Sequence, residues 1–311
     1  MLNLLINGGV ILRGRLLCIP CTVRTAYDVA RRSSMNDNVR FEVVMEVLRW
    51  LSSVKRISDY TPAELHTRVC RIAREITGNK DPFKDVKDLS NEVAMKVVSL
   101  LNRRIEETKS FRCAFRLAVL GTICGNTLDF EVEGYKPSLQ DLEKILLRCL
   151  NGSFYIDEID VLMKLLSRSR KVMYLLDNAG EIVFDKVLIE LILKHFSVEL
   201  WAIVKEGPVL NDATMIDAVQ VGLTDIVNVT TTGNDHIGLN MEETSDNFRL
   251  LLKEADLIIA KGQGYFESIP EVKCSISAPV CYILRTKCRL VAEALGAPLQ
   301  ENIVKIEIGE E

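Results

Sequence analysis

Residues 171–181, KVMYLLDNAGE, decide the fold. Residues 172–176 are apolar, and Asp177 and Asn178 follow them directly. A helical pattern of apolar residues begins after Glu181. This order predicts a buried parallel strand, a tight turn and a helix. Because ligands bind at the carboxyl ends of strands in open α/β sheets, we expect Asp177 and Asn178 to lie at a functional edge. A helix cap would also explain either residue.

The rest of the C-terminal half repeats this order of strand and helix. Apolar runs with strand character occur at 198–206, 226–232, 255–262 and 278–284, and helical segments lie between most of them. Alternating strands and helices are typical of a parallel sheet covered by helices. We therefore predict an α/β protein with a Rossmann-like, three-layer parallel sheet and a helical N-terminal region.

The N-terminal half has helical periodicity from about residue 18 to 150. Thr61, Pro62 and Glu64 have the order of a capping box at the start of one helix. No glycine- or serine-rich linker separates the two halves, which predicts an extensive interface. The predicted regions are an extension of unclear role at 1–17, a helical region at 18–165, and a Rossmann-like region carrying the metal site at 166–311.

Composition excludes several classes of protein. The chain has 311 residues, a formal net charge of −4, 48% hydrophobic and 26% charged residues, an ordinary soluble composition. A mildly acidic chain argues against a dedicated nucleic-acid binder, which needs a basic surface. No uninterrupted apolar run reaches about 18 residues, and the opening fits no targeting template. We expect a cytoplasmic protein without membrane or nucleic-acid partners.

Nine cysteines in a chain of this length do not resemble a disulfide framework. Most of them stand in apolar surroundings, where a free thiol acts as a small core residue. These expected free thiols are Cys70, Cys113, Cys124, Cys149 and Cys281. Cys18 and Cys21, in CIPC, have the spacing of half a zinc site or of a redox pair, and an idle structural role is the alternative.

A second strand end carries another acid. The strand at 198–206 runs into VKEGPVLNDAT, which places Asp212 one βαβ unit after Asp177. Neighbouring parallel strands would bring Asp177, Asn178 and Asp212 to one edge. Their oxygens suit a hard divalent cation, Mg²⁺ or Mn²⁺, with Co²⁺ or Ni²⁺ able to substitute. We assign Lys205, at the end of this strand, to the substrate-binding group, while a helix cap is the alternative for Asp212.

Two further motifs could contact a phosphate ester. Lys261 ends a predicted strand, and the following Gly262, Gln263 and Gly264 could present backbone N–H groups to an anion. The spacing is not that of a P-loop, and a simple glycine-rich turn is the alternative. GNTLDF at 125–130 follows a buried helix, and its turn residues become substrate contacts if the turn covers the pocket. We assign Asn126 and Asp129 this role.

Taken in order, CIPC, GNTLDF, LLDNAGEIVFDK, VKEGPVLNDAT, AKGQGYFES and LRTKCRLVAEALG resemble the damage-control phosphatase family, domain of unknown function 89, in its mostly prokaryotic branch with CxxC. The resemblance covers about residues 18–296. It implies metal-dependent hydrolysis of small phosphomonoesters: sugar phosphates or damaged or excess phosphometabolites, phosphopantetheine derivatives among them. It also implies that an Asp-Asn pair and a later Asp, here Asp177, Asn178 and Asp212, hold the metal.

The expected mechanism uses the metal as Lewis acid and Lys261 as a partner for charge on the phosphoryl oxygens. Glu181 would orient the attacking water or a substrate hydroxyl, and direct attack by Asp177 through an aspartyl-phosphate is the alternative route. A sugar-phosphate- or nucleotide-binding protein without catalysis is the alternative function, and a partner-binding module built on CIPC is a third. The sequence does not determine the substrate, the physiological metal or the oligomeric state.

Overall fold

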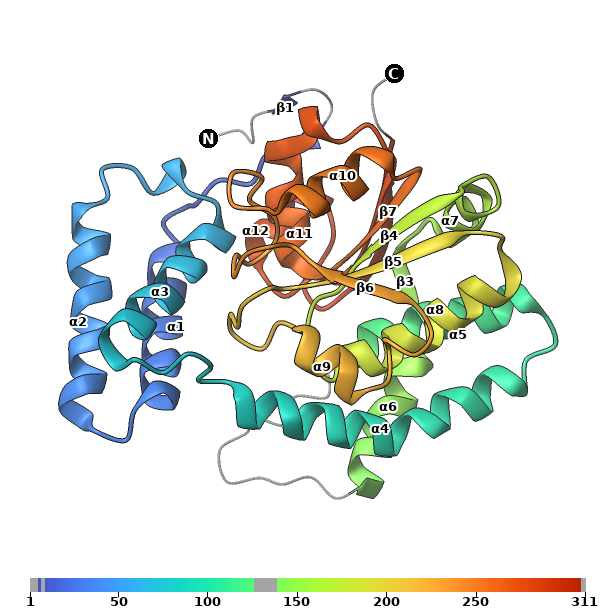
Figure 1. The fold of residues 1–311 in the computed structure, drawn as a ribbon, viewed down its shortest axis with the longest axis horizontal. Coiled ribbons are helices and arrows are strands. Elements are labelled where there is room, and N and C mark those ends of the chain that lie inside the picture. Colours follow the sequence, from blue (N-terminus) through green and yellow to red (C-terminus); the bar gives the residue numbers. More distant parts are fainter. Residues whose placement is uncertain (1–4, 7–8, 126–138, 309–311) are drawn as a thin grey trace.

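A seven-stranded sheet organises the molecule, with strand order β3-β9-β8-β7-β4-β5-β6 (Figure 1). The computed structural model describes residues 5–6, 9–125 and 139–308. The strands of this sheet are β3 (Phe154–Asp157), β4 (Lys171–Leu175), β5 (Glu199–Val204), β6 (Asn228–Thr231), β7 (Leu257–Lys261), β8 (Val280–Arg285) and β9 (Asn302–Glu307). A separate antiparallel pair, β1 (Leu5–Ile6) and β2 (Gly9–Val10), lies near the N-terminus.

Five consecutive strands of the sheet, β8-β7-β4-β5-β6, are parallel, which confirms the predicted fold class. β4 lies in the middle of these five and pairs with β7 on one side and β5 on the other. The sequence patterns did not reveal β9, which is antiparallel to β8, or β3, which is parallel to β9. β3 has four residues, two of them exposed, so its apolar run is too short to stand out from its surroundings.

Helices cover one face of the sheet and bury the larger hydrophobic core. α8 lies against the sheet and packs in turn on α4 and α5. Phe184 and Leu188, on α8, are fully buried in this core, as is Phe115 on α5. The helices of this layer are α4 (Lys84–Glu106), α5 (Phe111–Gly125), α6 (Leu139–Leu150), α7 (Ile159–Leu166), α8 (Glu181–His195) and α9 (Met215–Gln220).

A second core covers the opposite face. Alternate strand residues such as Met173, Leu175 and Ile203 point into it and meet Phe266 from the helical layer. Both faces are therefore buried, which explains why the central strands are almost continuously apolar. The elements here are α10 (Asp246–Glu254), α11 (Gly262–Ser268), the 3₁₀ segment η2 (Ile269–Ser275) and α12 (Arg289–Leu295).

The first three helices form a small bundle beside the sheet (Figure 1). Val29, Val43 and Val69 are buried where the three helices meet. The predicted capping box is present: Thr61 Oγ1 accepts a hydrogen bond from Glu64 N at 3.1 Å, and Thr61 N donates to Glu64 Oε2 at 2.6 Å. The elements are α1 (Cys18–Ser33), α2 (Asp37–Ser53), the 3₁₀ turn η1 (Ile57–Asp59) and α3 (Pro62–Thr77).

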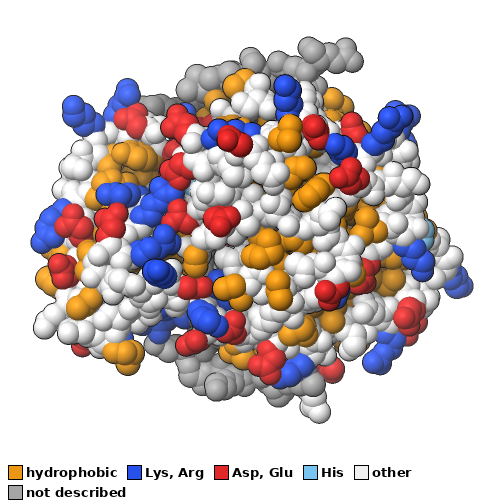
Figure 2. Space-filling view, viewed as in Figure 1, with side chains coloured by type: hydrophobic (Ala, Val, Ile, Leu, Met, Phe, Trp, Pro, Cys, Tyr) orange, Lys and Arg blue, Asp and Glu red, His pale blue; other side chains and the backbone are white. Residues whose placement is uncertain are grey.

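The surface mixes charges of both signs. On the face shown in Figure 2, basic and acidic side chains alternate and form no extended basic field. Arg71 illustrates the pattern, since it pairs with both Asp235 and Glu243. Within residues 5–6, 9–125 and 139–308, no helix combines the length and apolar character needed to cross a membrane.

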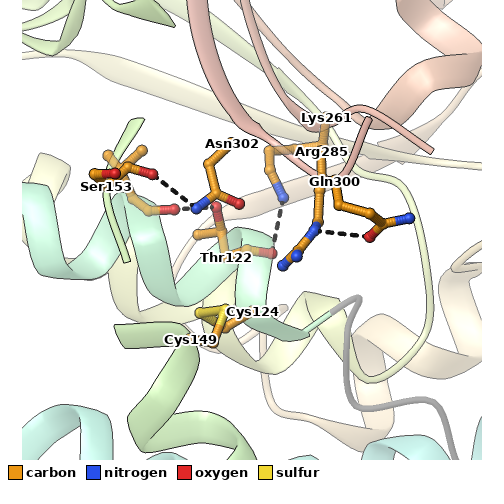
Figure 3. The surroundings of a disulfide bond; sticks show 9 residues. Thr122, Cys124, Cys149, Ser153, Lys261, Arg285, Gln300 and Asn302 are labelled. Atoms are coloured by element: carbon orange, nitrogen blue, oxygen red, sulfur yellow. Dashed lines mark hydrogen bonds between the residues drawn. A yellow bond between two sulfur atoms is a disulfide. The ribbon is translucent and has the colours of Figure 1, made fainter. Parts of the chain in front are cut away.

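One cysteine prediction is wrong. Cys124, at the end of α5, and Cys149, in α6, form a disulfide across 25 residues of sequence (Figure 3). Both had been expected to be free thiols because their neighbours are apolar, but two helices packed side by side bring their sulfur atoms together. Cys113 is free but exposed, whereas Cys70 and Cys281 are free and buried as expected.

We predict that losing this disulfide destabilises the fold. A cross-link over 25 residues restricts the unfolded chain, which corresponds to about 3 kcal/mol in the loop-entropy description. Cys149→Ser should therefore lower the free energy of unfolding by about that amount in denaturant titrations under oxidising conditions. Cys113→Ser, which removes an exposed free thiol from α5, is the matched control. Equal unfolding midpoints for both variants would contradict the role of the cross-link.

Candidate functional site

The structure brings Asp177, Asn178 and Asp212 together at the carboxyl edge of the sheet. Asp177 and Asn178 follow β4, and Asp212 lies in the segment after β5. Asn178 and Asp212 pair as an isolated antiparallel bridge, and Ala213 N donates to the carbonyl of Asp177 at 2.8 Å. The Asn178 amide also donates to Asp177 Oδ2 at 2.8 Å. The predicted juxtaposition of these three side chains is present.

Asp212 is buried and Asp177 is half-buried, and both lie close to other charges. Burial raises the pKa of Asp177 well above its ordinary value, and the nearby Glu181 and Asp212 raise it further, while Lys261 and Lys287 oppose the shift. Burial also raises the pKa of Asp212, to about 6. Two carboxylates held near each other and away from water favour the binding of a cation.

The backbone after β7 approaches Asp177 closely. Gly262 has φ +81°, and a Cβ placed on it would lie 2.0 Å from Asp177 Oδ2. A non-glycine residue would therefore meet both backbone strain and a direct clash with the carboxylate. Gly262, predicted as a phosphate contact, consequently belongs to the same site as Asp177.

Lys261 forms a buried ion cluster with two acids of α8. Its ammonium contacts Glu181 Oε1 at hydrogen-bond distance and lies 3.0 Å from Asp185 Oδ1. It also donates to the carbonyl of Thr122 at 3.4 Å (Figure 3). Burial alone would lower the pKa of Lys261, but Asp185 and Glu181 outweigh it and raise that pKa above its ordinary value. The described partners of Lys261 are thus protein groups, and its phosphate contact stays a prediction.

Asp185 is a member of the site that the sequence analysis missed. It is fully buried, accepts a hydrogen bond from Tyr174 Oη at 2.7 Å, and has a pKa raised by burial to about 7 despite Lys261. The signal was available, because a carboxylate on the buried side of an apolar helix requires a partner. The partner itself lies on another element and could not be read from the local pattern.

Lys205 is buried inside the site. Its ammonium donates to the carbonyl of Gly238 at 2.6 Å and to Tyr265 Oη at 3.1 Å, and lies 4.0 Å from Asp212 Oδ2. Burial lowers the pKa of Lys205 to about 8, against the opposing effect of Asp212 and Asp177. Lys205 therefore partly offsets the negative charge of Asp212. Its contact with substrate stays a prediction.

The structure has no loop after Lys261: residues 262–264, predicted as a glycine-rich turn, are the first residues of α11. Gln263 Oε1 accepts hydrogen bonds from Lys287 N at 2.8 Å and Cys288 N at 3.1 Å, so it joins α11 to the segment after β8. Gly264 lies in the first turn of α11, where its carbonyl accepts from Ser268 Oγ at 2.8 Å. Asn126 and Asp129 lie outside the described residues.

Asn91 of α4, also missed by the sequence analysis, holds the turn after β4 from outside. Its Oδ1 accepts from Gly180 N at 2.6 Å, and its Nδ2 donates to Asp217 Oδ1 at 2.9 Å and Gln220 Oε1 at 2.8 Å. One buried amide therefore joins α4, the turn and α9. Nothing in the local sequence around Asn91 indicates this role.

The donor set of the edge fits a hard cation. Asp177, Asn178 and Asp212 offer oxygen atoms, and Glu181 Oε2 is buried without a hydrogen-bond partner in the part of the chain that the structure describes. Among the same residues, no group of three or more His, Cys, Asp or Glu side chains is arranged to hold a metal. A cation here would thus rely on two carboxylates completed by amide, backbone or water oxygens.

The CIPC pair lies at the start of α1, away from these acids in sequence. Cys18 is buried and Cys21 exposed, and Cys21 Sγ lies 3.8 Å from His66 Nε2. Burial raises the pKa of both thiols, and the nearby Cys288 raises both pKa values further. A raised pKa disfavours the thiolate in the metal-free protein; the zinc, redox and structural roles of the pair stay predictions.

Comparison with known proteins identifies relatives along nearly the whole chain. The family described as "Damage-control phosphatase ARMT1-like domain" matches residues 16–303. An uncharacterized protein of Methanocaldococcus jannaschii is 36% identical over 92% of this chain and 93% of its own length. A protein of Archaeoglobus fulgidus named damage-control phosphatase is 33% identical over 93% of this chain and 98% of its own length. The crystal structure of a DUF89 family protein from Pyrococcus horikoshii superposes with a TM-score of 0.85 at 29% identity, covering 96% of this chain and 100% of that one.

We predict that the ion cluster is a stability element. Lys261→Met would leave Glu181 and Asp185 buried without a counter-ion and should lower the free energy of unfolding by about 3–5 kcal/mol. Adding Glu181→Gln and Asp185→Asn to that variant should recover much of the loss, measured by denaturant titration. Lys171→Met, which breaks an exposed pair with Glu254 at the other end of the sheet, should have little effect. Equal losses in the two single variants would contradict this role.

We also predict a specific cost at Gly262. Gly262→Ala adds left-handed backbone strain and a clash with Asp177, together about 2–5 kcal/mol. Gly296→Ala is the matched control, because Gly296 has φ +61° but its Cβ would meet nothing within 4 Å. That variant should lose only about 1–2 kcal/mol. Thermal and denaturant unfolding of both proteins would measure the difference, and similar losses would show that Asp177 yields to the methyl group.

Proposed function

Because the chain belongs to the damage-control phosphatase ARMT1-like domain family, we propose that it is a metal-dependent phosphatase of small phosphomonoesters. The substrates would be sugar phosphates or damaged or excess phosphometabolites, phosphopantetheine derivatives among them. The observation that carries the proposal is the meeting of Asp177, Asn178 and Asp212 at the carboxyl edge of the sheet. These oxygens come from two adjacent strand ends, and Gly262, the first residue of α11, approaches Asp177 too closely to carry a side chain.

Asp177, Asn178 and Asp212 would hold the divalent metal, Mg²⁺, Mn²⁺, Co²⁺ or Ni²⁺. When bound, the metal polarises a phosphoryl oxygen and lowers the pKa of a water molecule. The Asn178 amide donates to Asp177 Oδ2 at 2.8 Å, and the Gly262 backbone lies close to the same carboxylate, so its position is restricted. Such fixed positioning contributes to catalysis because less reorganisation is needed in the transition state.

The surrounding residues divide the remaining tasks. Glu181 keeps one buried oxygen free of described partners while the other is held by Lys261, so it can accept a proton or a hydrogen bond from the attacking water. The Gly262–Gly264 backbone could donate to phosphoryl oxygens. Lys205 and Lys261 balance the acidic edge from within the protein. Water attack and attack by Asp177 both fit this arrangement.

We predict that phosphate release requires a metal and the Asp177 carboxylate. A panel of phosphometabolites should be hydrolysed only after Mg²⁺, Mn²⁺, Co²⁺ or Ni²⁺ is restored to the chelated protein. Asp177→Asn should lower kcat/KM by about a thousandfold or more, because several kcal/mol of transition-state stabilisation are lost. Asp246→Asn, at an exposed carboxylate of α10, is the control.

The opposite outcome is equally informative. If folded wild-type protein releases no phosphate with any of these metals, the proposed hydrolysis is wrong. Ligand-induced shifts in melting temperature with the same panel would then test the alternative, a protein that binds phosphate esters without hydrolysing them.

A further inference from the structure

A cationic pocket lies at the same edge of the sheet as Asp177 and is used by none of the roles above. It has a volume of about 720 Å³ and lies between the C-terminal part of α6 and the ends of β8 and β9. Arg148, Arg285 and Lys287 line it, against a single acid, Glu301. The two arginines alone outnumber this carboxylate, so the lining carries an excess positive charge that attracts an anion.

Strand pairing places this pocket beside the predicted phosphate loop. Lys261 pairs with Ile283 of the neighbouring strand β8, and Arg285 follows two residues later on the same face. The two Cα atoms are thus roughly 8 Å apart, from the usual strand spacing and rise. Figure 3 shows the Lys261 and Arg285 side chains in the same region, beside the disulfide. One small molecule bound at the end of β7 could therefore also reach Arg285 in the pocket.

A hydrogen bond connects the pocket to α11. Gln263, in the first turn of α11, accepts from the backbone N–H of Lys287 in the pocket wall. The positive charge of Lys287 also lowers the pKa of the Asp177 carboxyl, against its overall rise. On the opposite wall, the disulfide with Cys124 holds Cys149, the residue next to Arg148.

A buried hydrogen-bond acceptor in the same pocket indicates that the ligand carries a hydroxyl group beside its anion. Asn302 is 7% exposed, and its Nδ2 donates to the carbonyl of Ser153 at 2.9 Å (Figure 3). Its Oδ1 is buried and accepts no hydrogen bond from any described residue. An unpaired buried acceptor is costly, and a ligand hydroxyl would satisfy it. Arg285 is partly committed, because its Nε donates to Gln300 Oε1 at 3.1 Å.

We propose that this pocket binds a second anionic group of the substrate, and that the preferred substrates are hydroxylated phosphomonoesters carrying such a group at the far end. Arg148 and Arg285 would hold the anion, and Asn302 would accept from a neighbouring hydroxyl. This inference rests on the proposed phosphatase function and narrows its substrate class. The second anion can be a carboxylate or a phosphate, since both form charge-assisted hydrogen bonds with guanidinium groups.

The test compares three esters with the same six-carbon skeleton: glucose 6-phosphate, 6-phosphogluconate and glucose 1,6-bisphosphate. Wild-type protein with metal should show a kcat/KM at least about tenfold higher for one or both doubly anionic esters, mainly through a lower KM. Preference for 6-phosphogluconate would identify a carboxylate site, and preference for the bisphosphate a phosphate site. Arg148→Gln and Arg285→Gln should each reduce this preference about tenfold.

Arg168→Gln is the matched control, because it removes an exposed arginine at the opposite edge of the sheet. It should leave the preference at the wild-type ratio. A wild-type ratio near one, or a ratio that neither pocket variant changes, would overturn the proposal. Arg148 is exposed, so its variant should fold normally, and circular dichroism would verify this.

A binding measurement separates failure of this inference from failure of the proposed function. If no ester is hydrolysed, the phosphatase proposal is wrong, but the pocket can still be tested by ligand-induced melting shifts. Glucose 1,6-bisphosphate or 6-phosphogluconate should then raise the melting temperature more than glucose 6-phosphate does, and Arg148→Gln should remove the difference. Identical shifts for all three esters would overturn the pocket assignment independently of catalysis.

Discussion

The buried ion cluster of Lys261, Glu181 and Asp185 is the constraint on which the site depends. Charges removed from water are tolerated when opposite charges pair, and here the Lys261 ammonium contacts both acids. Lys261 is the last residue of β7, and both acids lie in the first turns of α8. Their mutual attraction therefore fixes the start of α8 against the end of β7. The turn of Asp177 and Asn178 lies between these two fixed points.

The close approach of Gly262 to Asp177 follows from that arrangement. Because Lys261 is held at the helix start, the next residue must pass directly over the Asp177 carboxylate, which leaves no room for a side chain. Asn91 holds the same turn from the outer side through Gly180 N. The carboxylate edge is thus restrained from the sheet, from α8 and from α4. A site restrained from several directions has its donors positioned before a ligand arrives, which is the physical basis of preorganisation.

The pocket beside this edge is built from elements that the central sheet does not determine. Arg148 comes from α6, whose position is set by the disulfide and by packing on α4 and α5. Arg285 and Asn302 come from the antiparallel pair of β8 and β9. Acids at the ends of the central strands would supply the chemistry common to the fold, and these peripheral elements would select the substrate. Such a division is typical of α/β proteins, in which one scaffold supports many specificities.

The sequence by itself determined the class of fold and the acidic edge. The apolar run before Asp177, its repetition along the chain, and the capping box at Thr61 are local patterns with helical or strand periodicity, so they can be read without the fold. Asp177, Asn178 and Asp212 could be grouped because parallel strands bring their carboxyl ends to one edge. Gly262 was found for the same reason, since it directly follows the end of a strand.

Only the tertiary structure decided which partners these residues take. Lys261 stands 80 residues from Glu181 in sequence, and no local pattern indicates that its ammonium is buried between two acids. The pairing of Cys124 with Cys149 and the hydrogen bonds of Asn91 depend in the same way on how helices pack. The edge strand β3 and its neighbour β9 also needed the sheet to define them. The periodicity of apolar residues indicates whether a side chain faces the core, whereas long-range packing determines which residues it contacts in the core.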